Sequence, residues 1–167
     1  EFKQKMMELG QTWNTDGLTP QLADQVGQGL KQALTAAAQS AYQGFLQSYD
    51  PAEPTLEVEG HTLRWKCVSE KTFLTGFGSI TLGRNLYQAD AGGEGYVPLD
   101  TFWGMAGEFA TPEVREVALF STALVTPEET EQLLAKCAWF HPSATAIKNI
   151  VQEVGEFVEA HAKELDA

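Results

Sequence analysis

The segment Asp50-Pro51-Ala52-Glu53-Pro54 divides this chain into parts that cannot share one kind of secondary structure. A helix cannot run through it, because proline lacks a backbone N–H and clashes with the preceding turn. Before this break apolar residues recur every three or four positions, and directly after it they alternate with polar residues. The first pattern indicates a helix and the second a strand. We therefore predict an α+β fold that is mainly α.

Residues 1–50 are expected to be helical. Thr19-Pro20 is a start signal, because the hydroxyl can cap free amides and proline fits the first helical position. A shorter helix is predicted over residues 2–9. The apolar stripe of the long helix comprises Leu22, Val26, Leu30, Leu34, Ala38, Ala41 and Phe45. Its opposite side carries glutamines, and we expect the helix to serve packing or self-association.

Residues 51–100 are expected to form a small β ribbon. Alternation over residues 61–68 predicts a strand, and residues 73–87 predict a hairpin around the turn Gly76-Phe77-Gly78. A glycine-rich loop, Ala91–Gly95, follows and ends at Val97-Pro98-Leu99-Asp100. A sheet of about three strands is too small to be stable without neighbours.

Residues 101–167 return to helical spacing. Thr111-Pro112-Glu113 opens one helix, and Thr126-Pro127-Glu128-Glu129 is a capping box that opens the next. The last helix begins after His141-Pro142-Ser143. It has a four-three apolar spacing that fits either core packing or pairing with another helix, formed by Ile147, Val151, Val154, Val158, His161 and Leu165.

Composition excludes several classes of protein. The 43% hydrophobic and 20% charged fractions exclude an intrinsically disordered chain, and no apolar run is long enough for a membrane span. Cys67 and Cys137 are too few for a disulfide framework. They suit a reducing compartment, so we expect a cytoplasmic protein without membrane contact.

The net charge of −12 opposes nucleic-acid binding at long range. The charge is uneven, however, because residues 60–89 contain one acid, Glu70, and residues 132–152 contain none. Such windows arise by chance in an acidic chain, or they mark faces that an anion approaches. On the second interpretation the phosphate-contacting residues of the first window are Arg64, Lys66, Lys71 and Arg84.

Two neighbouring helices, Pro127–Cys137 and Ser143–Gly155, have the dimensions of a helix-turn-helix, although helix pairs of this size also occur in proteins that never touch DNA. The connection between them also lacks the glycine usual in that motif. In a helix-turn-helix the first turns of the second helix face the base edges, where hydroxyl, lysine and asparagine side chains can read DNA. The candidates here are Ser143, Thr145, Lys148 and Asn149.

Metal and catalytic motifs carry less weight. Cys137 with His141, and His61 with Cys67, could together close a zinc tetrahedron, but nothing in the sequence brings the two pairs together. Free cysteines are the commoner situation, so we expect no metal and no cofactor. The sequence also contains no nucleophile elbow, phosphate loop or catalytic carboxylate constellation.

Two strings resemble the N-terminal part of the ISKra insertion-sequence family of bacterial DDE transposases: TFLTGFGSITLGRNLYQADAGGEGYVPLD and TPEVREVALFSTALVTPEETEQLLAKCAWFHPSATAIKNIVQEVGEF. The matching features are an FG hairpin, a tyrosine-bearing strand, a glycine loop ending in Pro-Leu-Asp, and a helix-turn-helix of S-x-T type. Their counterparts here are Phe77-Gly78, Arg84, Tyr87, Pro98-Leu99-Asp100, Ser143 and Thr145. The resemblance implies recognition of transposon-end DNA.

The chain also departs from that family. Many relatives carry two cysteine pairs around the hairpin, which form a zinc ribbon, whereas this chain has Ala89 and Gly92 where the second pair would fall, and only Cys67 upstream. The ribbon is thus expected to be metal-free and held by Trp65, Phe73, Ile80, Leu82, Leu86 and Tyr87. The catalytic carboxylates of the family would lie after Ala167, so no residue here is predicted to be catalytic.

Three functions stay open from the sequence. The first is a DNA-binding module of a transposase. The second is an assembly module that pairs subunits while DNA is read elsewhere, and the third is a standalone regulatory protein derived from such a module.

Overall fold

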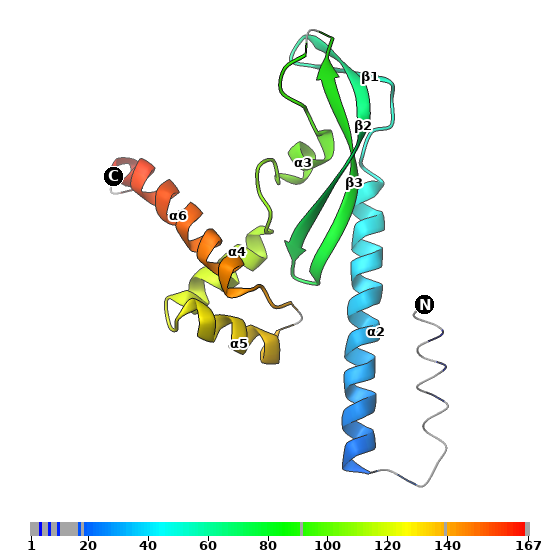
Figure 1. The fold of residues 1–167 in the computed structure, drawn as a ribbon, viewed down its shortest axis with the longest axis vertical. Helices are drawn as coiled ribbons and strands as arrows, with labels where there is room; N and C mark the ends of the chain where they lie inside the picture. The colour runs from blue at the N-terminus through cyan, green and yellow to red at the C-terminus, as the bar shows by residue number, and fades with distance from the viewer. Residues whose placement is uncertain are drawn as a thin grey trace.

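The computed structural model describes residues 4, 7, 10, 17, 19–90, 92–138 and 140–165 (Figure 1). The elements in chain order are helix α2 (Pro20–Gln47), strands β1 (Thr55–Val58), β2 (His61–Thr75) and β3 (Gly78–Ala89), and helices α3 (Pro98–Trp103), α4 (Pro112–Thr122), α5 (Pro127–Cys137) and α6 (Ala144–Leu165). The predicted α+β class is confirmed. Most of the short helix predicted over residues 2–9 lies outside the described residues.

The helix starts follow the predicted capping chemistry. The Thr19 side chain accepts a hydrogen bond from Leu22 N–H at the start of α2. Thr126 and Glu129 form the reciprocal capping box of α5. At α6 the Ser143 hydroxyl accepts from the backbone N–H of Ala146 at 3.2 Å. These side chains satisfy amides that a helix start otherwise leaves without partners.

Within the described residues the strands form one antiparallel sheet in the order β1-β2-β3. The β2–β3 hairpin closes at Thr75↔Gly78, as the FG turn predicted, and its register shifts once, between Trp65 and Cys67. Thr75 secures the turn, because its hydroxyl donates to Gly78 O and accepts from Phe77 N–H. The two runs of alternation separated by residues 69–72 belong to one continuous strand, β2.

A short helix stands where a loop end was expected. Residues 98–103 form α3, which stops at Gly104 in the left-handed region at φ 72°. Leu99 and Met105 of this segment pack with strand residues in one core. The buried side chains of that core are Leu46, Phe73, Ile80, Leu82, Leu99 and Met105.

Helix α2 does not meet the sheet through its predicted apolar stripe. Leu34 and Phe45 are exposed, at 47% and 56%, while Leu46 is buried and Tyr42 packs against the core. Two glutamines share this contact, because Gln39 donates to Ser79 O at 3.4 Å and Gln43 to Thr81 O at 3.0 Å. The edge of β3 offers unpaired carbonyls, so it selects the amide side of the helix.

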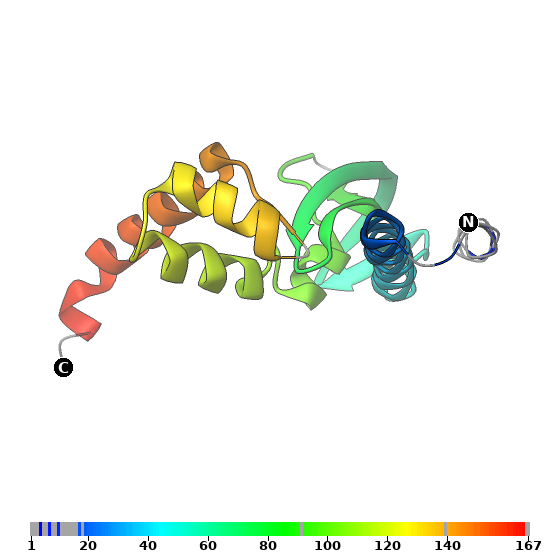
Figure 2. The same ribbon diagram turned by 90° about the horizontal axis from the view of Figure 1, so that it is seen from below.

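Helices α4–α6 lie on the other side of the sheet from α2 (Figures 1 and 2). They enclose a second core of buried residues: Ala110, Val114, Ala118, Leu134, Phe140 and Ile150. A parallel bridge between Leu74 and Ala110 connects them to the tip of the hairpin. Ile147 and Ile150 of α6 are buried, whereas Val151 and Val158 of the predicted seam are exposed, at 37% and 45%.

Candidate nucleic-acid interface

The first turns of α6 carry the predicted base-facing residues on the surface. Ile147 and Ile150 are fully buried against α4 and α5, which fixes the rotation of α6. Residues on the other sides of this helix start then turn to solvent. The exposed set is Ser143, Thr145, Lys148 and Asn149. The structure thus places Thr145, Lys148 and Asn149 in the first turns of α6, and Ser143 directly before them as its cap.

Lys148 is not free on that surface. Its ammonium donates to the Glu128 carboxylate on α5 at 2.6 Å, and both side chains are more than half exposed. The hydrogen bond from Lys148 holds the pKa of Glu128 below its ordinary value of 4.5. A phosphate that approaches Lys148 must therefore compete with a carboxylate. An exposed pair of this kind is weak, because water screens it.

The basic residues at the β1 end of the hairpin are also engaged. Arg64 pairs with Asp90 at 2.7 Å, and Lys66 donates to the Gln88 side chain at 2.9 Å. Lys71, further along β2, lies 4.8 Å from the centre of the Phe73 ring. A window with a single acid in the sequence is thus not a surface with a single acid, since Asp90 from the next loop pairs with Arg64.

Arg84 does not fit its predicted role as a phosphate contact. It is 5% exposed, forms an ion pair with Asp100 on α3, and lies 5.5 Å from the centre of the Phe73 ring. A guanidinium held by a buried carboxylate cannot reach a phosphate at the surface. Sequence alone gave Arg84 a position on a strand, but the burial of that position depends on α3, which the sequence did not predict.

The two predicted sets of DNA-contacting residues occupy different parts of the molecule. Arg64 pairs with Thr55 at the β1 end of the sheet, whereas the helical part joins the sheet at Leu74, near the hairpin tip. Figure 1 shows the β1 end at the top and the start of α6 at about mid-height, level with the other end of the hairpin. The residues do not form one continuous basic surface.

A polar cluster that the sequence did not reveal joins the break after α2 to β2 and β3. Asp50 accepts from the backbone N–H of Asn85 at 2.8 Å and from its side-chain amide at 2.9 Å. The Asn85 amide also donates to Pro51 O, and its oxygen accepts from the Trp65 indole. Burial raises the pKa of Asp50 above its ordinary value of 3.8, while the bonds from Asn85 oppose that rise. The only signal in the sequence was the position of Asp50 at the break.

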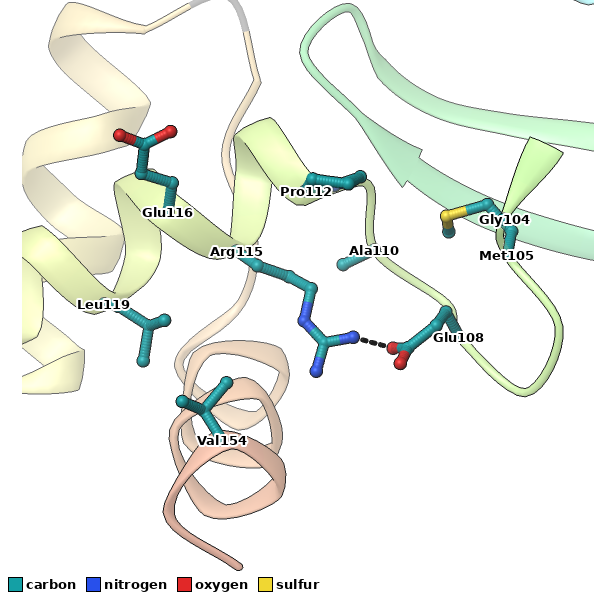
Figure 3. Close-up of a pocket in the computed structure, with 9 residues that line it drawn as sticks. All are labelled: Gly104, Met105, Glu108, Ala110, Pro112, Arg115, Glu116, Leu119 and Val154. Atoms are coloured by element: carbon teal, nitrogen blue, oxygen red, sulfur yellow. Dashed lines mark hydrogen bonds and ion pairs between the residues drawn. The ribbon is translucent and has the colours of Figure 1, made fainter. Parts of the chain in front are cut away.

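A cavity of about 470 Å³ opens between the α3–α4 connection and α6, and Figure 3 shows the residues that line it. Met105, Leu119 and Val154 make its apolar wall. Arg115 points across it toward Glu108, with which it pairs, and also reaches Glu153 at 3.4 Å. Two carboxylates neutralise the guanidinium, so this cavity does not offer a free cation for an anionic ligand.

The two candidate metal-ligand pairs lie in different parts of the fold: His61 and Cys67 on β2, and Cys137 and His141 at the end of α5 and just after it. Cys67 is exposed in the middle of β2, and Cys137 is exposed at the end of α5. In the described part of the chain no group of three or more His, Cys, Asp or Glu side chains could hold a metal ion. Among the same residues no helix combines the length and apolarity that crossing a bilayer requires.

Comparison with known proteins assigns no family. No protein-family model matches this sequence, and none of the curated proteins matches it. The function proposed below thus rests on the arrangement of this chain's own residues and on the resemblance to ISKra transposases that we infer from its sequence motifs.

Proposed function

We propose that this chain is a DNA-binding module of an insertion-sequence transposase and that α5 and α6 form its helix-turn-helix. The single observation that carries the proposal is the exposed start of α6, where Thr145, Lys148 and Asn149 project from a helix fixed by a buried apolar stripe. In this role the described residues bind transposon ends, and any cut-and-join chemistry lies elsewhere in the protein.

The chemistry of these side chains suits base edges. Asparagine can bond the two groups that adenine shows in the major groove, and lysine can contact guanine or phosphate. Ser143 is already used as a helix cap, so its hydroxyl contributes to position more than to readout. The helix presents the other three from adjacent turns, which is the spacing that a major groove admits.

The acidic character of the chain limits affinity. Asp90 and Glu128 neutralise Arg64 and Lys148 in the unbound protein, so DNA must displace both carboxylates. With Arg64, the residues Lys66 and Lys71 form a second, separate set of phosphate contacts on β2. Arg84 is not part of this set, because it is buried. We therefore expect weak binding that falls steeply with salt.

The main test is the double substitution Lys148→Ala with Asn149→Ala. Loss of one base contact and one cation should weaken binding to the element's terminal repeats about tenfold to a hundredfold. Fluorescence anisotropy with duplexes tiled across the DNA that flanks the gene measures this. The matched control is Gln132→Ala with Lys136→Ala, which removes an amide and an ammonium from exposed positions on α5. Equal affinity of the test variant and the parent would refute the assignment.

A second test uses the ion pair on the same surface. Glu128→Gln frees Lys148 without removing it, so DNA affinity should rise severalfold at low salt. Glu131→Gln, elsewhere on α5, changes the net charge equally and serves as the control. A rise of the same size in both variants would show that only net charge matters, and that Lys148 has no special position.

Assembly through α6 is the alternative function. The second half of α6 extends beyond α4 and α5. Phe157 and Val158 are 59% and 45% exposed there. An apolar face of this kind fits a partner helix. Val158→Glu should then reduce the oligomer size measured by light scattering and leave DNA affinity of the isolated module unchanged. A parent chain that is monomeric at high concentration would exclude this alternative.

A further inference from the structure

One stretch of the sheet has an open edge. In an antiparallel ladder the backbone groups of alternate residues point to opposite edges. On β2 the outward residues include Leu74, whose N–H donates to Phe109 O at 2.7 Å and whose carbonyl accepts from Thr111 N–H at 2.9 Å. The same alternation turns the N–H and C=O groups of Val68, Glu70 and Thr72 outward. Among the described residues these groups have no partner.

Two closures limit this open edge. At one end Trp65 N–H donates to Pro54 O at 2.9 Å, just before β1 covers the edge, and at the other end Leu74 is bridged to Ala110. Residues 66–73 lie between them, a length of about 25 Å at about 3.3 Å per residue. Of the side chains there Phe73 is buried and Ser69 and Lys71 are half-buried, whereas the others are exposed, with Val68 at 58%. The gap accommodates one short extended segment.

We propose that the edge Lys66–Phe73 binds a short extended segment of a partner protein, which adds a fourth strand beside β2. Main-chain hydrogen bonds to Val68, Glu70 and Thr72 would hold this segment, and side chains on its two faces would select it. This interaction does not depend on DNA binding by α6, but it would compete with the phosphate contacts proposed above for Lys66 and Lys71.

A second copy of this chain does not fit the edge through its own β2. That strand carries β1 and the Leu74–Ala110 bridge on the same edge, so in an antiparallel pair those closures would occupy the space that the facing strand needs. A symmetric pair centred on Glu70 would also place two carboxylates directly opposite each other, which is destabilising. The occupant is therefore a segment without such closures.

Charge indicates the chemistry of the segment. Arg64 and Arg84 are paired with Asp90 and Asp100, whereas Lys66 and Lys71 have no carboxylate partner among the described residues. Lys71 shares a face of β2 with Ser69 and Phe73, and Val68, Glu70 and Thr72 share the other. A segment that alternates acidic with β-branched residues places its carboxylates beside Lys71 and its apolar groups beside Val68 and Thr72.

The experiment uses the full chain and a blocked peptide of alternating valine and aspartate, flanked by threonines. In the unbound chain the amides of Val68, Glu70 and Thr72 should exchange with solvent much faster than those of Lys71 and Phe73. Peptide binding, followed by backbone-amide NMR, should slow that exchange and shift these resonances most. A peptide with lysine in place of aspartate should bind at least about tenfold more weakly.

Three variants make the test specific. Glu70→Pro removes one outward N–H that forms no hydrogen bond with β3, so it should weaken peptide binding about tenfold. Glu70→Ala keeps this N–H and should not weaken binding. Lys71→Glu should also weaken it, whereas Lys136→Glu on α5 should not. Should Glu70→Pro fail to fold, as its NMR spectrum would reveal, the two lysine variants decide. Equal peptide binding by Lys71→Glu and Lys136→Glu, or resonance shifts confined to α6, would overturn the proposal.

Discussion

The two edges of the β2–β3 hairpin differ in whether their outward backbone groups have hydrogen-bond partners. On β3 the backbone groups of Ser79, Thr81, Gly83, Asn85 and Tyr87 point away from β2. All of these residues except Gly83 form a hydrogen bond through such a group. The partners are Gln39, Gln43, Asp50 and Tyr96. On β2 the outward backbone groups of residues 66–73 have no hydrogen-bond partner among the described residues. An open edge invites pairing with another chain, and proteins usually cover it. The contrast indicates that the β2 edge is open for binding.

The closed edge also has a charged network behind it. Arg84 pairs with Asp100 inside the core. The charge of Arg84 lowers the pKa of Asp50, at the adjacent strand edge, and the charge of Asp100 raises it. On β2, by contrast, Arg64 forms an exposed pair with Asp90. Substitutions of the same type on the two sides should therefore have very different costs.

The largest effect is expected for Arg84→Leu. The Asp100 carboxylate would stay buried without its counter-charge, so the free energy of unfolding should fall by about 3–5 kcal/mol. Arg64→Leu breaks an exposed pair and should cost about 1 kcal/mol or less. Urea denaturation of both variants measures the difference. Similar costs would mean that the Arg84–Asp100 pair is not buried in solution.

Asp50→Ala should have the next largest effect. It leaves the backbone N–H of Asn85 without its acceptor, and we expect a loss of about 2 kcal/mol. Hydrogen exchange at Asn85 should become fast, as on the open edge. Asp90→Ala, which removes an exposed carboxylate, is the control. Slow exchange at Asn85 in the Asp50 variant would show that another group closes this part of β3.

The pH dependence of stability tests the same residue. Because burial raises the pKa of Asp50 in the folded chain, the folded state binds the proton more tightly than the unfolded state. The contribution of Asp50 to stability is thus fully present below its ordinary pKa of 3.8 and is lost as the pH rises through the raised pKa. Asp50→Asn should abolish this slope. Parallel stability curves for the two proteins between pH 3 and 7 would contradict the assignment.

The smallest effect is expected for Gln43→Ala. Its amide gives Thr81 one hydrogen bond, so the loss should be about 0.5–1.5 kcal/mol. Gln32→Ala, at an exposed position of α2, should be nearly neutral. Thermal unfolding of the pair decides whether a glutamine on the strand edge differs from one in solvent.

Local signals were enough to predict many elements. The capping residues Thr19 and Thr126, the two prolines after Asp50 and the alternation in the hairpin act within a few residues, so a pattern could show them. The face that α2 presents to the sheet was not predictable in this way. Hydropathy favoured Leu34 and Phe45, but the carbonyls of β3 required amide donors, and Gln39 and Gln43 supplied them.

The candidate site divides along the same line. The sequence determined that Lys148 and Asn149 stand at the start of a helix, because a cap and an apolar stripe fix that helix locally. Only the tertiary structure decided that Glu128 pairs with Lys148 and that Arg84 is buried in a pair with Asp100. It also decided that one edge of the hairpin has hydrogen-bond partners while a stretch of the other has none. Each of these depends on contacts between residues distant in the chain, and their free energy is set by burial and pairing that no local pattern contains.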